Sequence, residues 1–186
     1  MPFDDLRIDT PRLILRPPRL DDLNPLSDMM LDEPTARFIG GVAPRAMCWR
    51  QLMTMIGSWH AHGFAMFSVI ERETGRWVGR LGPWQPEGWP GPEIGWAIAR
   101  NRWGRGYAVE GAAAATTWAL DTLGWTRIIH SIAPANLASQ RVAEKLGSRN
   151  LGPGTLPAPF ANDRVDLWGQ TAEEWRARPD RGLTPV

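Results

Sequence analysis

The chain has 186 residues, and its 21 Lys and Arg nearly balance its 20 Asp and Glu, which gives a formal net charge of +1. So weak a charge gives no reason to expect nucleic acid or an anionic membrane as the main partner, and favours a small molecule or a peptide. A single cysteine, Cys48, excludes an internal disulfide framework, and the absence of a leader pattern or of ~18 uninterrupted apolar residues leads us to expect a cytoplasmic protein without a metal site.

The first third of the chain predicts one strand and two helices. Within residues 10–18, the apolar run Leu13-Ile14-Leu15 lies between Arg12 and Arg16, which fits a short strand whose alternate side chains face the core and the solvent. A helical stretch is expected over 21–30, interrupted by Pro25. Over 45–62 the apolar residues fall three and four apart, as on an amphipathic helix, and Gly63 is expected to end that helix.

The middle of the chain predicts strands and one long helix. Residues 64–71 and 77–81 are apolar, β-branched or aromatic runs that indicate a hairpin. A loop rich in Gly, Pro and Trp, 82–92, then leads to a third antiparallel strand at 93–98. The next segment, 106–123, carries small and apolar residues on one face and is the strongest predicted helix of the chain.

The last part predicts an alternation of strands and helices. Residues 127–132 indicate a strand, 136–146 a helix with Asn136 as its N-cap, and 165–169 a late strand. Thr171 and Glu174 match a capping box, so a short helical turn is expected to begin there. We therefore expect one α+β domain over residues 1–175 and a polar tail, 176–186, that is mobile.

The segment from Asn101 to Ala108 lies between a predicted strand and the strongest predicted helix. Gly104 and Gly106 allow a sharp turn, and the first backbone N–H groups of a helix lack partners and attract an anion. Arg102 and Arg105 would add positive charge for a pyrophosphate. A glycine-rich turn without a ligand stays an alternative, whereas the dinucleotide fingerprint and the P-loop do not fit the residues that follow.

The turn and three further motifs resemble one known family. Asn101-x-x-Gly104-x-Gly106 resembles the acetyl-CoA signature Q/R-x-x-G-x-G/A of the GNAT superfamily of acetyltransferases, with Asn101 in place of Gln or Arg. The motifs that begin at Thr10, Glu93 and Asn136 resemble the branch that contains the ribosomal-protein alanine N-acetyltransferases. The likeness runs from about residue 10 to residue 175.

This resemblance implies a fold and a cofactor. The fold would be a mixed, mostly antiparallel sheet that is splayed between its fourth and fifth strands and flanked by helices. Acetyl-CoA would enter that opening, with its pantetheine along the fourth strand and its pyrophosphate on the amides of the turn. The implied cofactor-binding residues are Ile98, Ala99, Arg100, Trp103, Gly104, Arg105, Gly106, Tyr107, Asn136 and Ser139.

The resemblance also implies candidates for proton transfer. Glu93, at the start of the fourth strand, is the predicted base that deprotonates the acceptor amine, and a structural role as an exposed or paired carboxylate is the alternative. His60, His62 and His130 have suitable intrinsic pKa values and are further candidates. Many family members place a tyrosine acid where this chain has Ala143, so Ser139 or a water would protonate the leaving thiolate.

The leading hypothesis is an N-acetyltransferase that acts by direct attack in a ternary complex. The acceptor is a small-molecule amine or a protein N-terminus, and the loop at 83–92 and the turn at 59–64 favour the smaller of the two. A coenzyme A-binding module without catalysis and a Trp-lined carbohydrate-binding protein are the alternatives. Homodimers are common in the resembled branch, so a homodimer is one expectation, and the acceptor, the base and the oligomeric state stay open.

Overall fold

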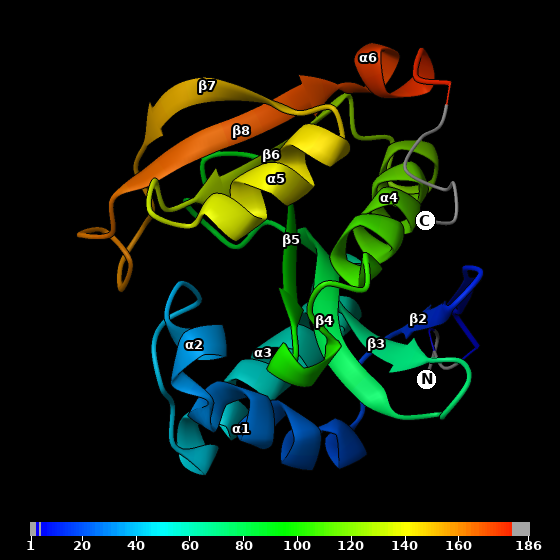
Figure 1. The fold of residues 1–186 in the computed structure, drawn as a ribbon, viewed down its shortest axis with the longest axis vertical. Coiled ribbons are helices and arrows are strands. Elements are labelled where there is room, and N and C mark those ends of the chain that lie inside the picture. The colour runs from blue at the N-terminus through cyan, green and yellow to red at the C-terminus, as the bar shows by residue number, and fades with distance from the viewer. Residues whose placement is uncertain (1–2, 4, 180–186) are drawn as a thin grey trace.

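The computed structural model describes residues 3 and 5–179 of the chain, and its centre is one sheet of eight strands (Figure 1). The predicted tail beyond residue 179 lies outside the described residues. The strands are β1 (Ile8–Asp9), β2 (Leu13–Arg16), β3 (Phe67–Glu71), β4 (Trp77–Trp84), β5 (Glu93–Ile98), β6 (Arg127–Ile132), β7 (Arg149–Gly154) and β8 (Val165–Thr171).

Six α-helices connect and cover the strands. They are α1 (Leu23–Leu31), α2 (Glu33–Ala36), α3 (Arg45–His62), α4 (Tyr107–Thr122), α5 (Leu137–Lys145) and α6 (Ala172–Arg176). Two short 3₁₀ turns, η1 (Leu20–Asp22) and η2 (Arg100–Arg102), precede α1 and follow β5. The predicted end of α3 is confirmed, because Gly63 has φ +77° and its N–H closes the last turn on Trp59.

The spatial order of the strands is β1-β2-β3-β4-β5-β6-β8-β7. Every neighbouring pair is antiparallel except β5 and β6, which run parallel. The predicted mixed, mostly antiparallel sheet is therefore confirmed. Figure 1 shows β6, β7 and β8 turned across the start of β5, with α5 lying over them.

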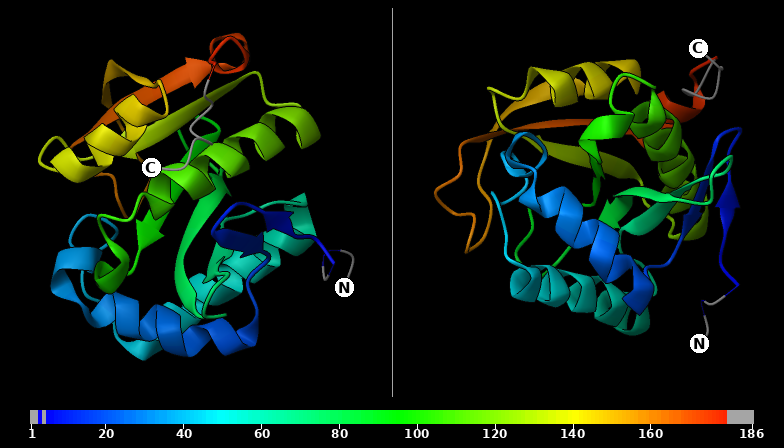
Figure 2. Two further views of the ribbon diagram at one scale, coloured as in Figure 1. Left: turned by 45° about the vertical axis from the view of Figure 1, so that its right-hand side comes forward. Right: turned by 60° about the horizontal axis from the view of Figure 1, so that its bottom comes forward.

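The two faces of the first five strands are covered by different helices. Helix α4 packs on β2, β4 and β5, and α1 packs on β4 from the other face, beside α3 (Figure 2). A Cβ at Gly111 of α4 would lie 2.5 Å from the side chain of Leu81, so glycine lets the helix approach the sheet closely. The alanines at 112–115 are buried as well.

In the described part of the chain, β5 pairs with β6 only at its first residue, opposite the middle of β6. Their register pairs Glu93 with Ile129, and the N–H of Ile129 donates to the carbonyl of Pro92 at 2.9 Å. His130 of β6 then contacts the carbonyl of Ile94. Beyond this point the two described strands share no further register pair, so the sheet opens between the predicted fourth and fifth strands, as expected.

Three elements were absent from the sequence-based expectations: β1, α2 and β7. Strand β7 has the sequence Arg-Asn-Leu-Gly-Pro-Gly at the edge of the sheet, where its side chains are mostly exposed, so it lacks the apolar alternation by which strands are recognised. The predicted loop at 82–92 also begins too early, because β4 continues to Trp84.

Candidate active site at the parting of β5 and β6

A turn with two left-handed glycines leads from β5 into α4. Gly104 has φ +74° and Gly106 has φ +78°, and Gly106 is the N-cap of the helix. A Cβ at Gly104 would meet no atom within 4 Å, so this corner opens outward. The first N–H groups of α4 follow this corner directly and lack intrahelical partners, which fits a pyrophosphate.

Glu71 of β3 holds the turn from beneath. Its carboxylate accepts hydrogen bonds from Arg102 Nε at 3.0 Å, Tyr107 Oη at 2.8 Å and Thr74 Oγ1 at 2.6 Å. The bonds from Thr74, Tyr107 and Arg102 lower the pKa of Glu71 to about 2, although burial alone would raise it. The carboxylate is therefore ionised at neutral pH and fixes both ends of the turn.

Arg102 was expected to add positive charge for a pyrophosphate, and the structure gives it a different role. Its guanidinium is only 15% exposed and is paired with Glu71, so its charge is already neutralised within the protein. Arg105 is 52% exposed, with Nη1 3.7 Å from the same carboxylate. Of the two arginines, Arg105 is the one placed to meet a phosphate.

Glu110 ties the first turn of α4 to the start of β2. Its Oε1 accepts from Thr10 Oγ1 at 2.7 Å and from the Arg12 backbone N–H at 2.8 Å, and its Oε2 accepts from Arg12 Nε at 2.6 Å. Arg12 also donates to the carbonyl of Arg105 at 2.8 Å. The motif at Thr10 and the glycine turn are thus one connected structure.

Replacing Glu110 by Gln is expected to lower the free energy of unfolding by about 2 kcal/mol, because an amide N–H would face the Arg12 guanidinium in place of a charged acceptor. Urea unfolding followed by circular dichroism measures the change. Glu173→Gln, on the exposed face of α6, is the matched control and should cost less than about 0.5 kcal/mol. Equal midpoints for the two variants would contradict this assignment.

The last residues of β5 border both the opening and the turn. The N–H of Ala99 donates to the carbonyl of Val78 in β4 at 2.8 Å, so by alternation the N–H and carbonyl of Ile98 face the β6 side. The indole of Trp103 donates to the carbonyl of Ile98 at 2.6 Å and closes the corner between strand and turn. Of the predicted cofactor-binding residues Ile98 and Ala99, Ile98 therefore presents its backbone to the opening, and Ala99 does not.

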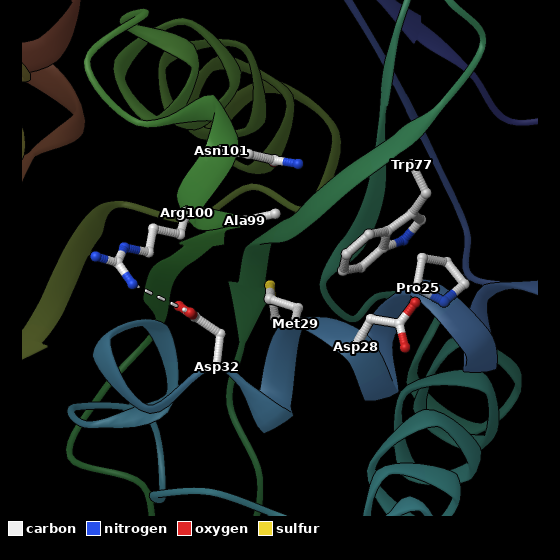
Figure 3. Close-up of a pocket in the computed structure, with 8 residues that line it drawn as sticks. All are labelled: Pro25, Asp28, Met29, Asp32, Trp77, Ala99, Arg100 and Asn101. Carbon is white, nitrogen blue, oxygen red and sulfur yellow. Dashed lines mark ion pairs between the residues drawn. The ribbon is translucent and has the colours of Figure 1, made fainter.

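A hollow of about 630 Å³ lies on the α1 side of Ala99 and Arg100 (Figure 3). Figure 3 shows Met29 and Asp28 on α1 and Trp77 on β4 around this hollow, with Arg100 paired to Asp32 at 3.5 Å. The two carboxylates disfavour a phosphate in this hollow. The open corner at Gly104 is thus the better site for an anion, and Arg100 is directed toward Asp32.

Glu93 lies where β5 and β6 part. Its Oε2 accepts from Trp89 Nε1 at 2.7 Å and from Ser131 Oγ at 2.8 Å. Burial raises the pKa of Glu93 to about 7, because the hydrogen bonds from Trp89 and Ser131 only partly offset the loss of solvation. A buried carboxyl with a pKa near neutrality is suited to accept and release a proton, which argues against an exposed or charge-paired glutamate.

The structure does not support any of the three histidines as the base in place of Glu93. His130 is 1% exposed, and burial lowers its pKa to about 4. Its Nδ1 faces the carbonyl of Ile94 at 2.7 Å and its Nε2 faces Ser148 Oγ at 2.9 Å, so the ring is neutral and joins β5 to β6. His60 and His62 are exposed in the last turn of α3.

Ser139 reaches the opening from the other face of the sheet. Trp96 stands three residues after Glu93 on β5, so the two side chains point to opposite faces. The Trp96 indole donates to Ser139 Oγ at 3.2 Å, and the N–H of Ser139 donates to Asn136 Oδ1 at 3.1 Å. Asn136 thus caps α5, and Glu93 and Ser139 flank the opening from opposite sides.

The structure brings most of the predicted site residues around this opening, and it adds some. Three residues were missed from the sequence: Ser131 and Glu71, whose contacts are distant in sequence, and Trp89, which lies in a loop. The turn at 59–64 was expected to narrow the acceptor site. The ring of Trp59 instead lies buried in the core against Phe67. Among the described residues, no group of His, Cys, Asp and Glu is arranged to hold a metal, and no helix has the length and apolarity to cross a membrane.

Comparison with known proteins gives a consistent result. The family model described as "Acetyltransferase (GNAT) domain" matches residues 12–149. The crystal structure of an acetyltransferase from Agrobacterium tumefaciens superposes with a TM-score of 0.77 and 27% sequence identity, over 90% of this chain and 95% of that one.

Two relatives from Bacillus subtilis match shorter segments. The uncharacterized protein YkkB is 36% identical over 88 residues, which is 46% of this chain and 51% of the relative. The uncharacterized N-acetyltransferase YnaD is 32% identical over 111 residues, which is 59% of this chain and 65% of the relative. The chain thus spans between half and two thirds of the length of these relatives.

Proposed function

Since the chain belongs to the GNAT acetyltransferase family, we propose that it transfers the acetyl group of acetyl-CoA to a primary amine by direct attack in a ternary complex. The observation that carries this proposal is the position of Glu93. A buried carboxyl whose pKa is about 7 lies where β5 and β6 part, and a helix N-terminus that opens outward follows the other end of β5.

The residues around the opening fit acetyl-CoA. The N–H groups that follow Gly104 would hold the pyrophosphate together with Arg105, and the backbone of Ile98 would pair with the pantetheine. Bound acetyl-CoA supplies the thioester whose acetyl group the amine accepts while the thiol leaves. The bond from Trp103 to the carbonyl of Ile98 would limit the pantetheine to the remaining backbone groups of β5.

Glu93 would act on the acceptor amine. An alkyl amine is mostly protonated at neutral pH, so its nitrogen becomes nucleophilic only when a base removes a proton. With its Oε2 held by Trp89 and Ser131, Glu93 would accept that proton on Oε1. The amine would approach from the face of the sheet on which Glu93 lies.

Ser139 would return a proton on the opposite face. Its Oγ accepts the Trp96 indole N–H, so the hydroxyl hydrogen is available to another acceptor. A coenzyme A thiol has a pKa roughly like that of cysteine, so the hydroxyl or a water suffices. This matters because Ala143, at the position of the family tyrosine, is fully buried.

Turnover is expected to depend on pH through Glu93. The carboxyl is protonated below pH 7 and ionised above it. At saturating substrates, kcat should therefore fall about tenfold per pH unit below 7 and level off above it. Thiol release from acetyl-CoA measures this, with alkyl amines and peptides with a free N-terminal alanine as acceptors; a flat profile from pH 5.5 to 8.5 would exclude Glu93 as the base.

The acceptor is proposed to be a small amine rather than a long peptide. The loop that carries Trp89 lies against the loop between β7 and β8, where the rings of Trp89 and Phe160 are 6.3 Å apart. This contact restricts space beside Glu93. If acetyl-CoA raises the melting temperature but no acceptor releases thiol, the chain is instead a coenzyme A-binding module without catalysis.

A further inference from the structure

Three loops meet beside Glu93 through aromatic and glycine contacts. The loop between β4 and β5 carries Trp89, whose ring packs edge-on against Phe160 of the loop between β7 and β8. A Cβ at Gly40, between α2 and α3, would lie 3.7 Å from the ring of Phe160. The first two loops also approach each other at Gly88, where an added Cβ would lie 3.4 Å from Pro157.

The two oxygens of Glu93 have different surroundings. Oε2 receives both donors, the indole of Trp89 at 2.7 Å and the hydroxyl of Ser131 at 2.8 Å. Oε1 is directed along β5, because a Cβ at Gly95 would lie only 3.2 Å from it. Gly95 lies further along the strand, where β5 has already parted from β6.

We propose that Trp89 and Ser131 are positioning residues that fix Oε2 of Glu93 and leave Oε1 to accept the proton of the amine. Phe160 supports Trp89 in this role, so the loop between β7 and β8 acts on the base without touching it. The inference rests on the proposed role of Glu93 as the base.

Among residues 3 and 5–179, no charged neighbour competes with these two donors. The ionisable side chains on the strands and loops beside Glu93 are Arg80, Glu87, Arg127, His130, Asp163 and Arg164. None of them is among the groups that shift the pKa of Glu93, which are burial and the bonds from Trp89 and Ser131. Loss of either donor therefore acts directly on the ionised form of the carboxyl.

The test compares pH profiles of kcat. Trp89→Phe keeps an aromatic ring and removes the indole donor, so the acidic limb should move about 0.5 to 1 pH unit toward higher pH. Turnover should then fall about three- to tenfold at pH 6 and stay within about twofold of wild type at pH 9. The KM for acetyl-CoA should not change, and Ser131→Ala and Phe160→Ala should move the limb in the same direction.

Trp175→Phe is the matched control. Trp175 lies in α6, and this change removes the hydrogen bond from its indole to Thr117 Oγ1 at 3.2 Å. It should therefore lower stability without moving the acidic limb of the kcat profile. Wild-type turnover in Glu93→Gln would refute the proposed base. Lost turnover in Glu93→Gln, together with unmoved limbs in both Trp89→Phe and Ser131→Ala, would refute the positioning role alone.

Discussion

Gly104→Glu is expected to weaken acetyl-CoA binding by at least about 100-fold, as measured by isothermal titration calorimetry. The new carboxylate would lie at the open N-terminal corner of α4, where the helix dipole and free N–H groups are proposed to hold a pyrophosphate. Repulsion between two unit charges about 4 Å apart is worth several kcal/mol near a protein surface, so bulk and charge act together.

The fold should survive this change with a modest loss of stability. A side chain at φ +74° costs about 1 to 2 kcal/mol, and no atom lies within 4 Å of a Cβ there. Gly124→Glu is the matched control, since Gly124 has φ +68°, equally open surroundings and a position at the far end of α4. Similar melting temperatures with a loss of affinity only in Gly104→Glu would support the site, and unchanged affinity would refute it.

Glu93→Gln is expected to lower kcat by about 10²- to 10⁴-fold above pH 7, because the amide cannot accept the proton. Affinity for acetyl-CoA should change little, since Glu93 lies at the root of the opening and away from the glycine turn. Steady-state turnover and calorimetry on the same preparation separate the two effects. Glu87→Gln, at an exposed position in the loop between β4 and β5, is the control that should keep full activity.

The same substitution should stabilise the protein at alkaline pH. The folded-state pKa of Glu93, about 7, lies above the ordinary value of 4.5, so the folded protein binds this proton more tightly than the unfolded chain does. The stability that Glu93 contributes is therefore present below pH 4.5 and lost as the pH rises through 7. At pH 8 Glu93→Gln should unfold at higher urea, by up to about 3 kcal/mol, whereas an active and less stable variant would mark Glu93 as structural.

Local patterns predicted the elements that contact the core. Helix α3 and strand β6 have the predicted bounds, because apolar periodicity and a terminal glycine mark one and a β-branched run marks the other. Helix α4 begins one residue after the predicted start, since Gly106 is its N-cap. The edge strand β7 carries no such pattern, since its pairing with β8 depends on backbone bonds of exposed residues.

The residues of the candidate site also fall into those that a local sequence pattern reveals and those that it does not. Gly104, Glu93 and Asn136 could be found in the sequence because each belongs to a compact motif beside a predicted element. The partners that give these residues their properties could not, because Trp89 is one of the chain's 11 tryptophans and lies in a loop, and Ser131 reaches Glu93 only through strand pairing. The raised pKa of Glu93 arises from tertiary burial, which no local pattern encodes.

The contact between Glu71 and the glycine turn has a consequence for how such chains diverge. Glu71 lies 31 residues before Arg102 and 36 before Tyr107, yet its carboxylate bonds to both. A change at any one of the three removes a hydrogen bond that the Glu71 carboxylate makes with Arg102 or Tyr107, so these positions should vary together over evolution. Arg105, whose guanidinium is half exposed and 3.7 Å from the same carboxylate, is less tightly tied to Glu71 than Arg102 and Tyr107 are.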